Sequence, residues 1–383
     1  MFTILKKDPT TKARTGIIHT PHGDVHTPLF NPIGTKGAVK TIAAEELRFW
    51  GAEMILANTY HLWMRPGDAL IAKAGGLHKF MNWKGAIFTD SGGFQAFSLS
   101  KLVKVTDHSV TFRSDLDGSL YDLSPEVSMQ IQLNLGSDIA VVLDDFPGYP
   151  AKEEDVVESV TRTAEWARRS KIEHDRVVKH TVNPGQQLWG IVQGSTFPHL
   201  RKRSAMLTRE LGFAGYAIGG VAVGEPEEEM YKAIDNSIPF LEEEKPKHLL
   251  GVGTPEQIIR SVARGCDSFD CVIPTREARH GRLYVNLKPG QGAGYYTINI
   301  NNEQHKEDFQ PVDNTCNCYC CVNFTRSYVR HLFMSGEPLG IRLATMHNLR
   351  FYLNLMERIR TAIDSGSFEQ LLKDYQPLPN QPV

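Results

Sequence analysis

The chain has 383 residues, of which 41% are hydrophobic and 22% are charged, with a formal net charge of −2. This length allows one large α/β domain with an appendage, or two ordinary domains. No apolar run approaches the roughly 18 residues of a membrane span, and the N-terminus lacks a signal-peptide core, so we expect a cytoplasmic protein. Because the charge is near neutral, any site for a polyanion must depend on local clusters.

Residues 1–27 predict short strands with turns at 8–9, at Gly16 and at 21–23, which we interpret as a lid or hairpin in front of the main domain. Eight short apolar segments then recur, each followed by a helix or an insertion. They cover residues 27–34, 53–59, 86–92, 139–145, 187–194, 215–220, 248–253 and 268–272. Helices are expected over about 40–51, 152–177, 197–211 and 225–240, and another begins near Thr254, an N-cap residue before a proline.

Continuous apolar runs, rather than alternation, are typical of parallel strands that are covered on both faces. Eight in succession, over a span close to the ~250 residues usual for the fold, predict an α/β protein built as a (β/α)8 TIM barrel. An open doubly wound sheet is the alternative. Polar residues or glycines end six of the segments: Asn58, Asp90, Asp144, Gln193, Gly220 and Asp270. In a barrel they would converge on one mouth, whereas in an open sheet they would spread along an edge.

Two insertions interrupt this pattern. Residues 100–123 predict a hairpin that ends at Asp117-Gly118. A polar segment over 283–346 precedes the last helix, expected over 347–365, and the tail from 376 is expected to fray. We therefore divide the chain into 1–282 (N-terminal hairpin and barrel strands), 283–346 (an insertion) and 347–383 (last helix and tail).

The insertion carries a metal-binding pattern. Four of the six cysteines lie within residues 316–321. Cys316, Cys318 and Cys321, with His347 further on, would supply three thiolates and one imidazole, a complete tetrahedral shell for one structural Zn²⁺. This set leaves Cys320 spare. A group of free buried thiols is the alternative interpretation.

Two groups of residues at the strand ends suggest a pocket for a flat ligand. In Asp90-Ser91-Gly92-Gly93-Phe94, the glycines would let backbone N–H groups approach the ligand, and Phe94 could stack on it. Asp90 could act as a general acid or base, although a tight turn capped by Asp explains this motif taken alone. Asp144 and Asp145 offer carboxylates that suit the N–H edges of a purine, or they cap the next helix.

The stretch 266–282 places Asp270 at a strand end, ahead of Pro274 and a basic cluster that contains Arg276 and Arg279. It is either a site for chemistry on a polyanion or a strand end with a solvated basic loop. With Asp90 opposite, Asp270 could attack an anomeric carbon as in retaining glycosidases, while the arginines hold a nucleic-acid backbone.

Together these motifs resemble the tRNA-guanine transglycosylases, the queuine tRNA-ribosyltransferase family, most closely their bacterial form. The matching segments are 90–94, 190–194, 216–225, 251–256, 269–276 and the Cys316, Cys318, Cys321 and His347 set. The resemblance implies a homodimer with a zinc subdomain inserted in the barrel. It implies a pentosyltransferase of queuosine biosynthesis, which exchanges the wobble guanine of tRNAs with GUN anticodons for a 7-deazaguanine.

The resemblance also implies residue roles. Asp270 would be the nucleophile at the ribose C1′ and form a covalent ribosyl-aspartate, while Asp90 would be the general acid/base. The implied base-binding residues are Asp90, Ser91, Gly92, Gly93, Phe94, Asp144, Gln193 and Gly220. The implied RNA-binding residues are Gly251, Val252, Gly253, Thr254, Pro255, Glu256 and Gln257, with Thr275, Arg276, Glu277, Ala278 and Arg279.

Two departures from the bacterial pattern, Phe146 after the fourth strand and Val221 after the sixth, would alter the pocket wall. The incoming base is by default 7-aminomethyl-7-deazaguanine (preQ1), with queuine as the alternative. A hydrolytic glycosidase would share the two acids, but it would not need the glycine-rich pocket, the arginine cluster or the zinc. A non-catalytic partner subunit would be expected to lack one of the acids.

Overall fold

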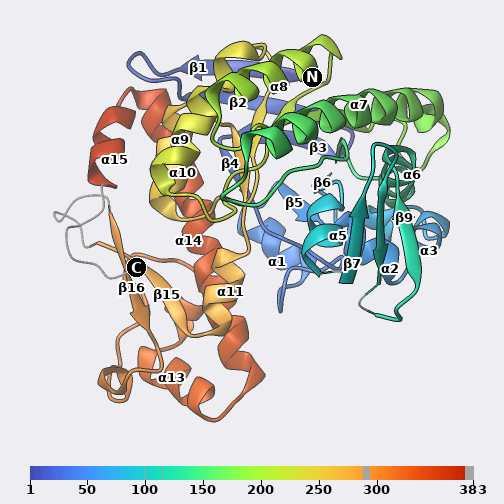
Figure 1. Ribbon diagram of the computed structural model, residues 1–383. Helices are drawn as coiled ribbons and strands as arrows, with labels where there is room; N and C mark the ends of the chain where they lie inside the picture. The colour runs from blue at the N-terminus through green and yellow to red at the C-terminus, as the bar shows by residue number, and fades with distance from the viewer. Residues whose placement is uncertain (100, 115, 288–293, 376–383) are drawn as a thin grey trace.

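A nearly closed barrel of eight parallel strands forms the centre of the computed structural model, which describes residues 1–99, 101–114, 116–287 and 294–375 (Figure 1). The strands are β4 (Leu29–Asn31), β5 (Met54–Ala57), β6 (Ala86–Thr89), β10 (Ile139–Val141), β11 (Gln187–Val192), β12 (Tyr216–Ile218), β13 (Lys247–Leu249) and β14 (Ser268–Asp270). Every neighbouring pair is parallel.

The ring closes just past β4. There the backbone N–H of Leu56 donates to the Pro32 carbonyl at 3.0 Å, and the Gly34 N–H donates to the Leu56 carbonyl at 2.7 Å. The predicted barrel is therefore confirmed over the open sheet. Seven of these strands lie inside one of the eight apolar segments, and β13 begins one residue before its segment. The carboxyl ends of the strands face one mouth.

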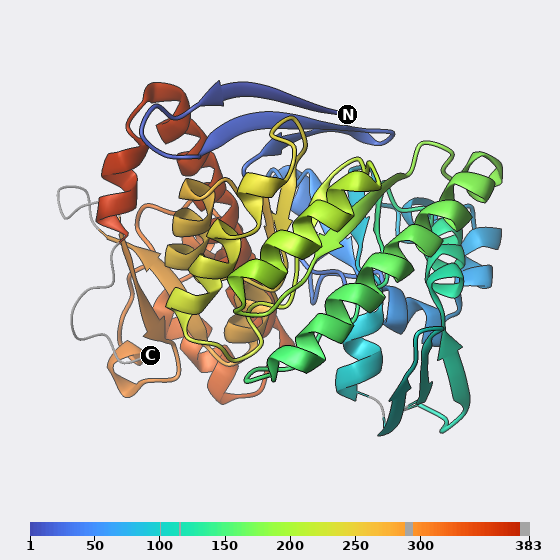
Figure 2. The same cartoon turned by 45° about the horizontal axis from the view of Figure 1, so that its top comes forward.

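Helices cover the outside of the barrel (Figures 1 and 2). They include α1 (Ala44–Phe49), α6 (Pro125–Leu135), α7 (Glu153–Val177), α8 (Pro198–Glu210), α9 (Glu227–Asp235), α10 (Pro255–Ala263) and α14 (Pro338–Ser365). As expected, Thr254 caps α10, and it forms a capping box with Gln257. We did not expect α6, although Ser124 as N-cap and Pro125 in its first turn are a local start signal.

Shorter helices follow β5 and β6. They are α2 (Thr59–Met64), α3 (Asp68–Lys73), α4 (Leu77–Phe80) and α5 (Gly93–Leu99). α5 begins inside the glycine-rich motif, so the residues after Asp90 form a helix start rather than only a turn. None of the helices in the described ranges is long and apolar enough to cross a membrane.

The N-terminal segment forms a three-stranded antiparallel sheet of β1 (Phe2–Lys7), β2 (Arg14–Thr20) and β3 (Gly23–Thr27). Gly16 lies inside β2, so the predicted turn there is wrong. The sheet is not a lid over the mouth. Arg14 pairs with Asp267, just before β14 begins, at 2.7 Å, and this contact places the sheet against the opposite, amino-terminal end of the barrel (Figure 2).

The first insertion is a three-stranded antiparallel sheet of β7 (Lys101–Val105), β8 (Val110–Arg113) and β9 (Leu120–Leu123). It contains the predicted hairpin and one further strand; positions 100 and 115 lie outside the described residues. The second insertion contains β15 (Arg282–Asn286), β16 (Tyr295–Asn299), α12 (Tyr319–Asn323) and α13 (Arg326–Met334).

Two boundaries near the C-terminus differ from expectation. The last long helix, α14, begins at Pro338 rather than at 347, so His347 lies well inside it. The basic stretch after β14 is a helix, α11 (Ile273–Arg279), and not a loop. Pro274 lies in its first turn, where a missing N–H costs nothing. α15 (Phe368–Asp374) follows α14, and the predicted frayed tail lies outside the described residues.

Candidate active site and metal centre

A cavity of about 480 Å³ opens at the carboxyl ends of the barrel strands. Of the residues predicted from the sequence, those that line it are Asp90, Ser91, Phe94, Asp144, Gly220, Gly251, Asp270 and Arg276. Its wall also contains Phe146, Val221 and Val223, with apolar side chains from β5, β10 and β11. The barrel therefore brings together three carboxylates that are far apart in the sequence.

Asp90, directly after β6, is held by the residues that follow β5. The backbone N–H of Thr59 donates to Asp90 Oδ1 at 2.9 Å, and the Asn58 amide donates to Oδ2. Burial raises the pKa of Asp90 to about 7 and the negative charge of Asp270 adds to the rise, although the donated hydrogen bonds oppose it. A carboxyl group with this pKa can both give and take a proton near neutral pH.

Asp144, three residues beyond β10, is held from two sides at the cavity wall. The Ser91 hydroxyl donates to its Oδ1 at 2.9 Å, and the Gln193 amide donates to its Oδ2 at 2.6 Å. Burial, with the negative charge of Asp145, raises the pKa of Asp144 to about 6. Within the described residues, Gln193 Oε1 is buried and has no hydrogen-bond partner, so it remains available as an acceptor.

Asp145, unlike its neighbour Asp144, is not part of the cavity wall. Its carboxylate forms an ion pair with Arg162 of α7, outside the barrel, and it is absent from the lining of the cavity. The two adjacent acids are thus separated by the alternation of side chains along an extended segment.

The floor of the cavity beside Gln193 depends on Gly220 and on a buried arginine. Gly220 has φ +61°, and a side chain there would clash with the Gln193 amide. Arg201 of α8, which the sequence analysis missed, is fully buried. Its guanidinium donates to the Gly219 carbonyl at 2.7 Å and to the Gly220 carbonyl at 2.9 Å. It fixes the turn after β12 from behind.

Asp270, the last residue of β14, accepts two hydrogen bonds on the same oxygen. His248 Nε2 lies 2.9 Å from Asp270 Oδ1, and the Gly251 backbone N–H lies 3.2 Å from it. His248 was not singled out from the sequence. The available signal was a histidine inside an otherwise apolar strand segment, which more often marks a satisfied core side chain.

Two aromatic rings stand at the rim. Phe94 is half exposed, and its ring lies parallel to that of Phe146, with centroids 5.9 Å apart and planes at 7°. Both line the cavity together with Val221. The two positions that depart from the bacterial pattern are therefore part of the pocket wall.

The two expected RNA-binding segments flank Asp270. Residues 251–257 form the loop after β13 and the first turn of α10, and residues 275–279 lie in α11. Thr275 and Ala278 are buried, whereas Arg276 is exposed and lines the cavity. Glu256 accepts a hydrogen bond from Tyr295 at 2.9 Å. The exposed part of the segment 275–279 is therefore mainly basic.

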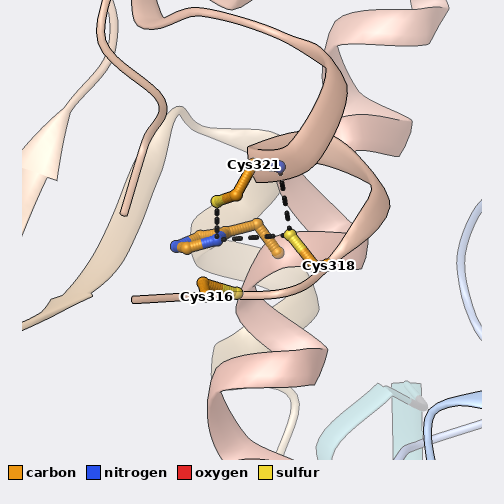
Figure 3. A group of neighbouring side chains, drawn as sticks. Cys316, Cys318 and Cys321 are labelled. Carbon is orange, nitrogen blue, oxygen red and sulfur yellow. Dashed lines mark hydrogen bonds between the residues drawn. The ribbon is translucent and has the colours of Figure 1, made fainter. Parts of the chain in front are cut away.

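A buried group of metal-ligating side chains lies beneath α12. The Sγ atoms of Cys316, Cys318 and Cys321 and a ring nitrogen of His347 all lie within 4.8 Å of one another (Figure 3). His347 Nδ1 is 3.2 Å from Cys321 Sγ, and Nε2 is 2.6 Å from the Tyr284 carbonyl, which fixes the ring. Cys320 is buried but outside the group.

The chemistry of this group fits a structural metal ion. Hydrogen bonds from Cys316 and Cys321 lower the pKa of Cys318, which favours the thiolate, the form that binds metals. Three sulfurs and one imidazole nitrogen match the shell that zinc prefers, and they leave no open position for catalysis.

Comparison with known proteins gives the family. Residues 8–377 match the family model for queuine tRNA-ribosyltransferase. A relative of that name from Pelotomaculum thermopropionicum is 50% identical over 374 residues, which cover 98% of this chain and 97% of the relative. Relatives of the same name from Moorella thermoacetica (48% identical; 98% and 96% covered) and Francisella tularensis subsp. novicida (47%; 98% and 97%) are similar over the same extent. With its barrel, its acidic cavity and its Cys3His group, this chain belongs to the queuine tRNA-ribosyltransferase family, whose members are pentosyltransferases.

Proposed function

We propose that this chain exchanges the wobble guanine of tRNAs with GUN anticodons for preQ1, through a covalent intermediate on Asp270. The observation that supports this most is the unequal treatment of two carboxylates in one cavity. Both oxygens of Asp90 accept hydrogen bonds and its pKa is about 7, whereas Asp270 is held on one oxygen only, by His248 and the Gly251 backbone. One group is arranged to attack and the other to manage a proton.

In the first half of the reaction, Asp270 Oδ2 attacks the ribose C1′ as the glycosidic C1′–N9 bond breaks. The bonding electron pair leaves with guanine, and the proton of Asp90 neutralises the departing base. In the second half, N9 of the incoming deazaguanine attacks C1′ and its proton passes to Asp90. The C1′–Oδ2 bond breaks, and its electron pair returns to the Asp270 carboxylate.

The base would lie between the groups at the cavity wall. Asp144 and the free Gln193 Oε1 would accept from its N–H groups, the Gly220 backbone would form the floor, and Phe94 would stack on its face. Ser91, Gly92 and Gly93 would shape the turn that holds Asp144. We assign preQ1 rather than queuine because Phe146 puts bulk on the wall, which favours a small 7-substituent.

The remaining assignments concern the tRNA and the assembly. The segments 251–257 and 275–279 would hold the anticodon loop over Asp270, with Arg276 and Arg279 at the phosphates, because splayed single-stranded loops suit base exchange. One Zn²⁺ per subunit would stabilise the insertion. Exposed apolar side chains on α12 and α13, such as Tyr319, Val322 and Met334, would pack against a second copy in a homodimer. Such an enzyme would act in the cytoplasm.

The test is an exchange assay on tRNA that carries labelled guanine at the wobble position, chased in parallel with guanine, preQ1 and queuine. We expect label release only with an acceptor base, preQ1 as the best acceptor, and a protein–RNA adduct that survives denaturation. Asp270→Ala should abolish both exchange and adduct. A persistent adduct in that variant would contradict the assignment of the nucleophile, and label release with water alone would favour the hydrolytic glycosidase.

A further inference from the structure

We propose that His248 is a positioning residue for Asp270, and that Ser268 sets the tautomer in which it acts. This inference rests on the proposed function, because it concerns the residue proposed there as the nucleophile. It assigns a role to His248 and Ser268, two buried polar side chains inside the barrel that are not needed for any proposed contact with the base or the RNA.

The register of two strands brings the three side chains together. His248 of β13 lies opposite Ser268 of β14, and Asp270 is two residues beyond Ser268. Because side chains alternate along a strand, Ser268 and Asp270 point to the same side of β14, toward the barrel interior. His248 Nδ1 lies 2.8 Å from Ser268 Oγ, and its Nε2 lies 2.9 Å from Asp270 Oδ1.

These contacts define which nitrogen of a neutral ring carries hydrogen. The Asp270 carboxylate can only accept, so Nε2–H donates to it. Nδ1 is then an acceptor, and the Ser268 hydroxyl donates to it. The imidazole is fully buried and packs on the Phe88 ring, with centroids 4.6 Å apart, so it is held on its face as well as at both nitrogens.

The consequence is that the two oxygens of Asp270 become unequal. Oδ1 accepts from both His248 and the Gly251 backbone. Among the described residues, no hydrogen bond involves Oδ2, which makes it the oxygen free to attack. The carboxylate is thereby fixed in rotation, and alignment of a reacting atom to within about 1 Å is worth on the order of 100-fold in rate.

The same two donors serve the second half of the reaction. In the ribosyl ester Oδ2 is bonded to C1′, and Oδ1 is the carbonyl oxygen, which keeps its hydrogen bonds from His248 and Gly251. When the incoming base displaces Oδ2, negative charge returns to the carboxylate, and the donors are already in place to stabilise it. A histidine that served only the core would supply packing but would not affect this step.

The experiment measures single-turnover formation of the protein–RNA adduct in the full-length enzyme, with tRNA affinity measured separately. His248→Phe keeps a ring but removes both nitrogens, and we expect adduct formation to slow by about 10- to 100-fold with unchanged tRNA affinity. His248→Gln can still donate to Asp270, and we expect it to recover most of the rate. Ser268→Ala removes only the group that sets the tautomer, and we expect a smaller loss.

Thermal unfolding of each variant controls for folding, and Ser268→Ala, the smallest change, keeps the test informative if His248→Phe is unstable. A native rate in folded His248→Phe would overturn the inference, as would a folded His248→Gln no faster than His248→Phe. So would a native rate in Ser268→Ala if His248→Phe does not fold. Asp270→Asn distinguishes failure of the proposed function from failure of this inference. An adduct in that variant would overturn the proposed function. An inert Asp270→Asn with unaffected His248 variants would overturn only the positioning role of His248.

Discussion

In the proposed reaction, the proton chemistry of Asp90 predicts two pH dependences of opposite sign. In the free enzyme, burial and the charge of Asp270 raise the pKa of Asp90 to about 7. Release of guanine needs the protonated form, so kcat/KM for tRNA should be lost as pH rises through about 7, by about tenfold per unit above it. Attack by the incoming base needs the ionised form, so kcat/KM for the base should be lost as pH falls.

The two midpoints should differ. Once Asp270 is esterified its negative charge is gone, and one cause of the raised pKa of Asp90 is removed. The midpoint for the base should therefore lie below that for tRNA, which reports on the free enzyme. The assay is steady-state exchange from about pH 5.5 to 9, with tRNA affinity measured at each pH as a control for binding.

Asn58→Ser tests the assignment of these midpoints to Asp90. The Asn58 amide donates to Asp90, and its Oδ1 caps α2 by accepting from the His61 N–H at 2.9 Å. Serine can still cap the helix but has no amide to donate. A hydrogen bond to a charged group contributes about 1.5–3 kcal/mol, so both midpoints should rise by about 1–2 pH units. A flat profile through pH 7, or midpoints that do not move in Asn58→Ser, would refute the reasoning.

Asp144→Ala should raise KM for the incoming base by about 10- to 100-fold and leave tRNA affinity unchanged, because one acceptor for the base is lost; equal loss of both would argue against its role. Arg276→Ala should weaken tRNA binding and lower the salt slope by about 1, whereas Arg176→Ala, at the far end of α7, should change neither. Cys318→Ser should remove stoichiometric zinc and lower the unfolding temperature, while Cys320→Ser should keep the metal; protein purified without added zinc that contains none would contradict the site.

Local patterns were sufficient for much of this protein. The barrel follows from eight continuous apolar segments, since strands buried on both faces have no polar side to alternate with. The three cysteine ligands follow from their spacing, since ligands that are close in the chain need little help from the rest of it, whereas His347 comes from α14. Strand-end residues such as Asp90, Asp144 and Asp270 were identified because the carboxyl ends of parallel strands must meet at one mouth.

The local signals failed where distant segments decide the outcome. The start of α14 was missed although Pro338 in its first turn is a local start signal, because Glu337 makes no side-chain cap bond. The N-terminal strands were predicted from the sequence, but the position of their sheet relative to the barrel was not. Tertiary contacts, such as that of Arg14 with Asp267, put their sheet at the end of the barrel away from the cavity.

The sequence by itself determined which chemical groups this protein has and which end of the barrel they occupy. The tertiary structure decided how each group is used, because hydrogen-bond partners and burial come from strands far apart in the chain. It paired His248 with Asp270, turned Asp145 away to Arg162, and raised the pKa of Asp90 by burying it near a second acid. Two acids that look alike in the sequence thereby acquire different hydrogen-bond partners, and that difference is what the proposed exchange reaction requires.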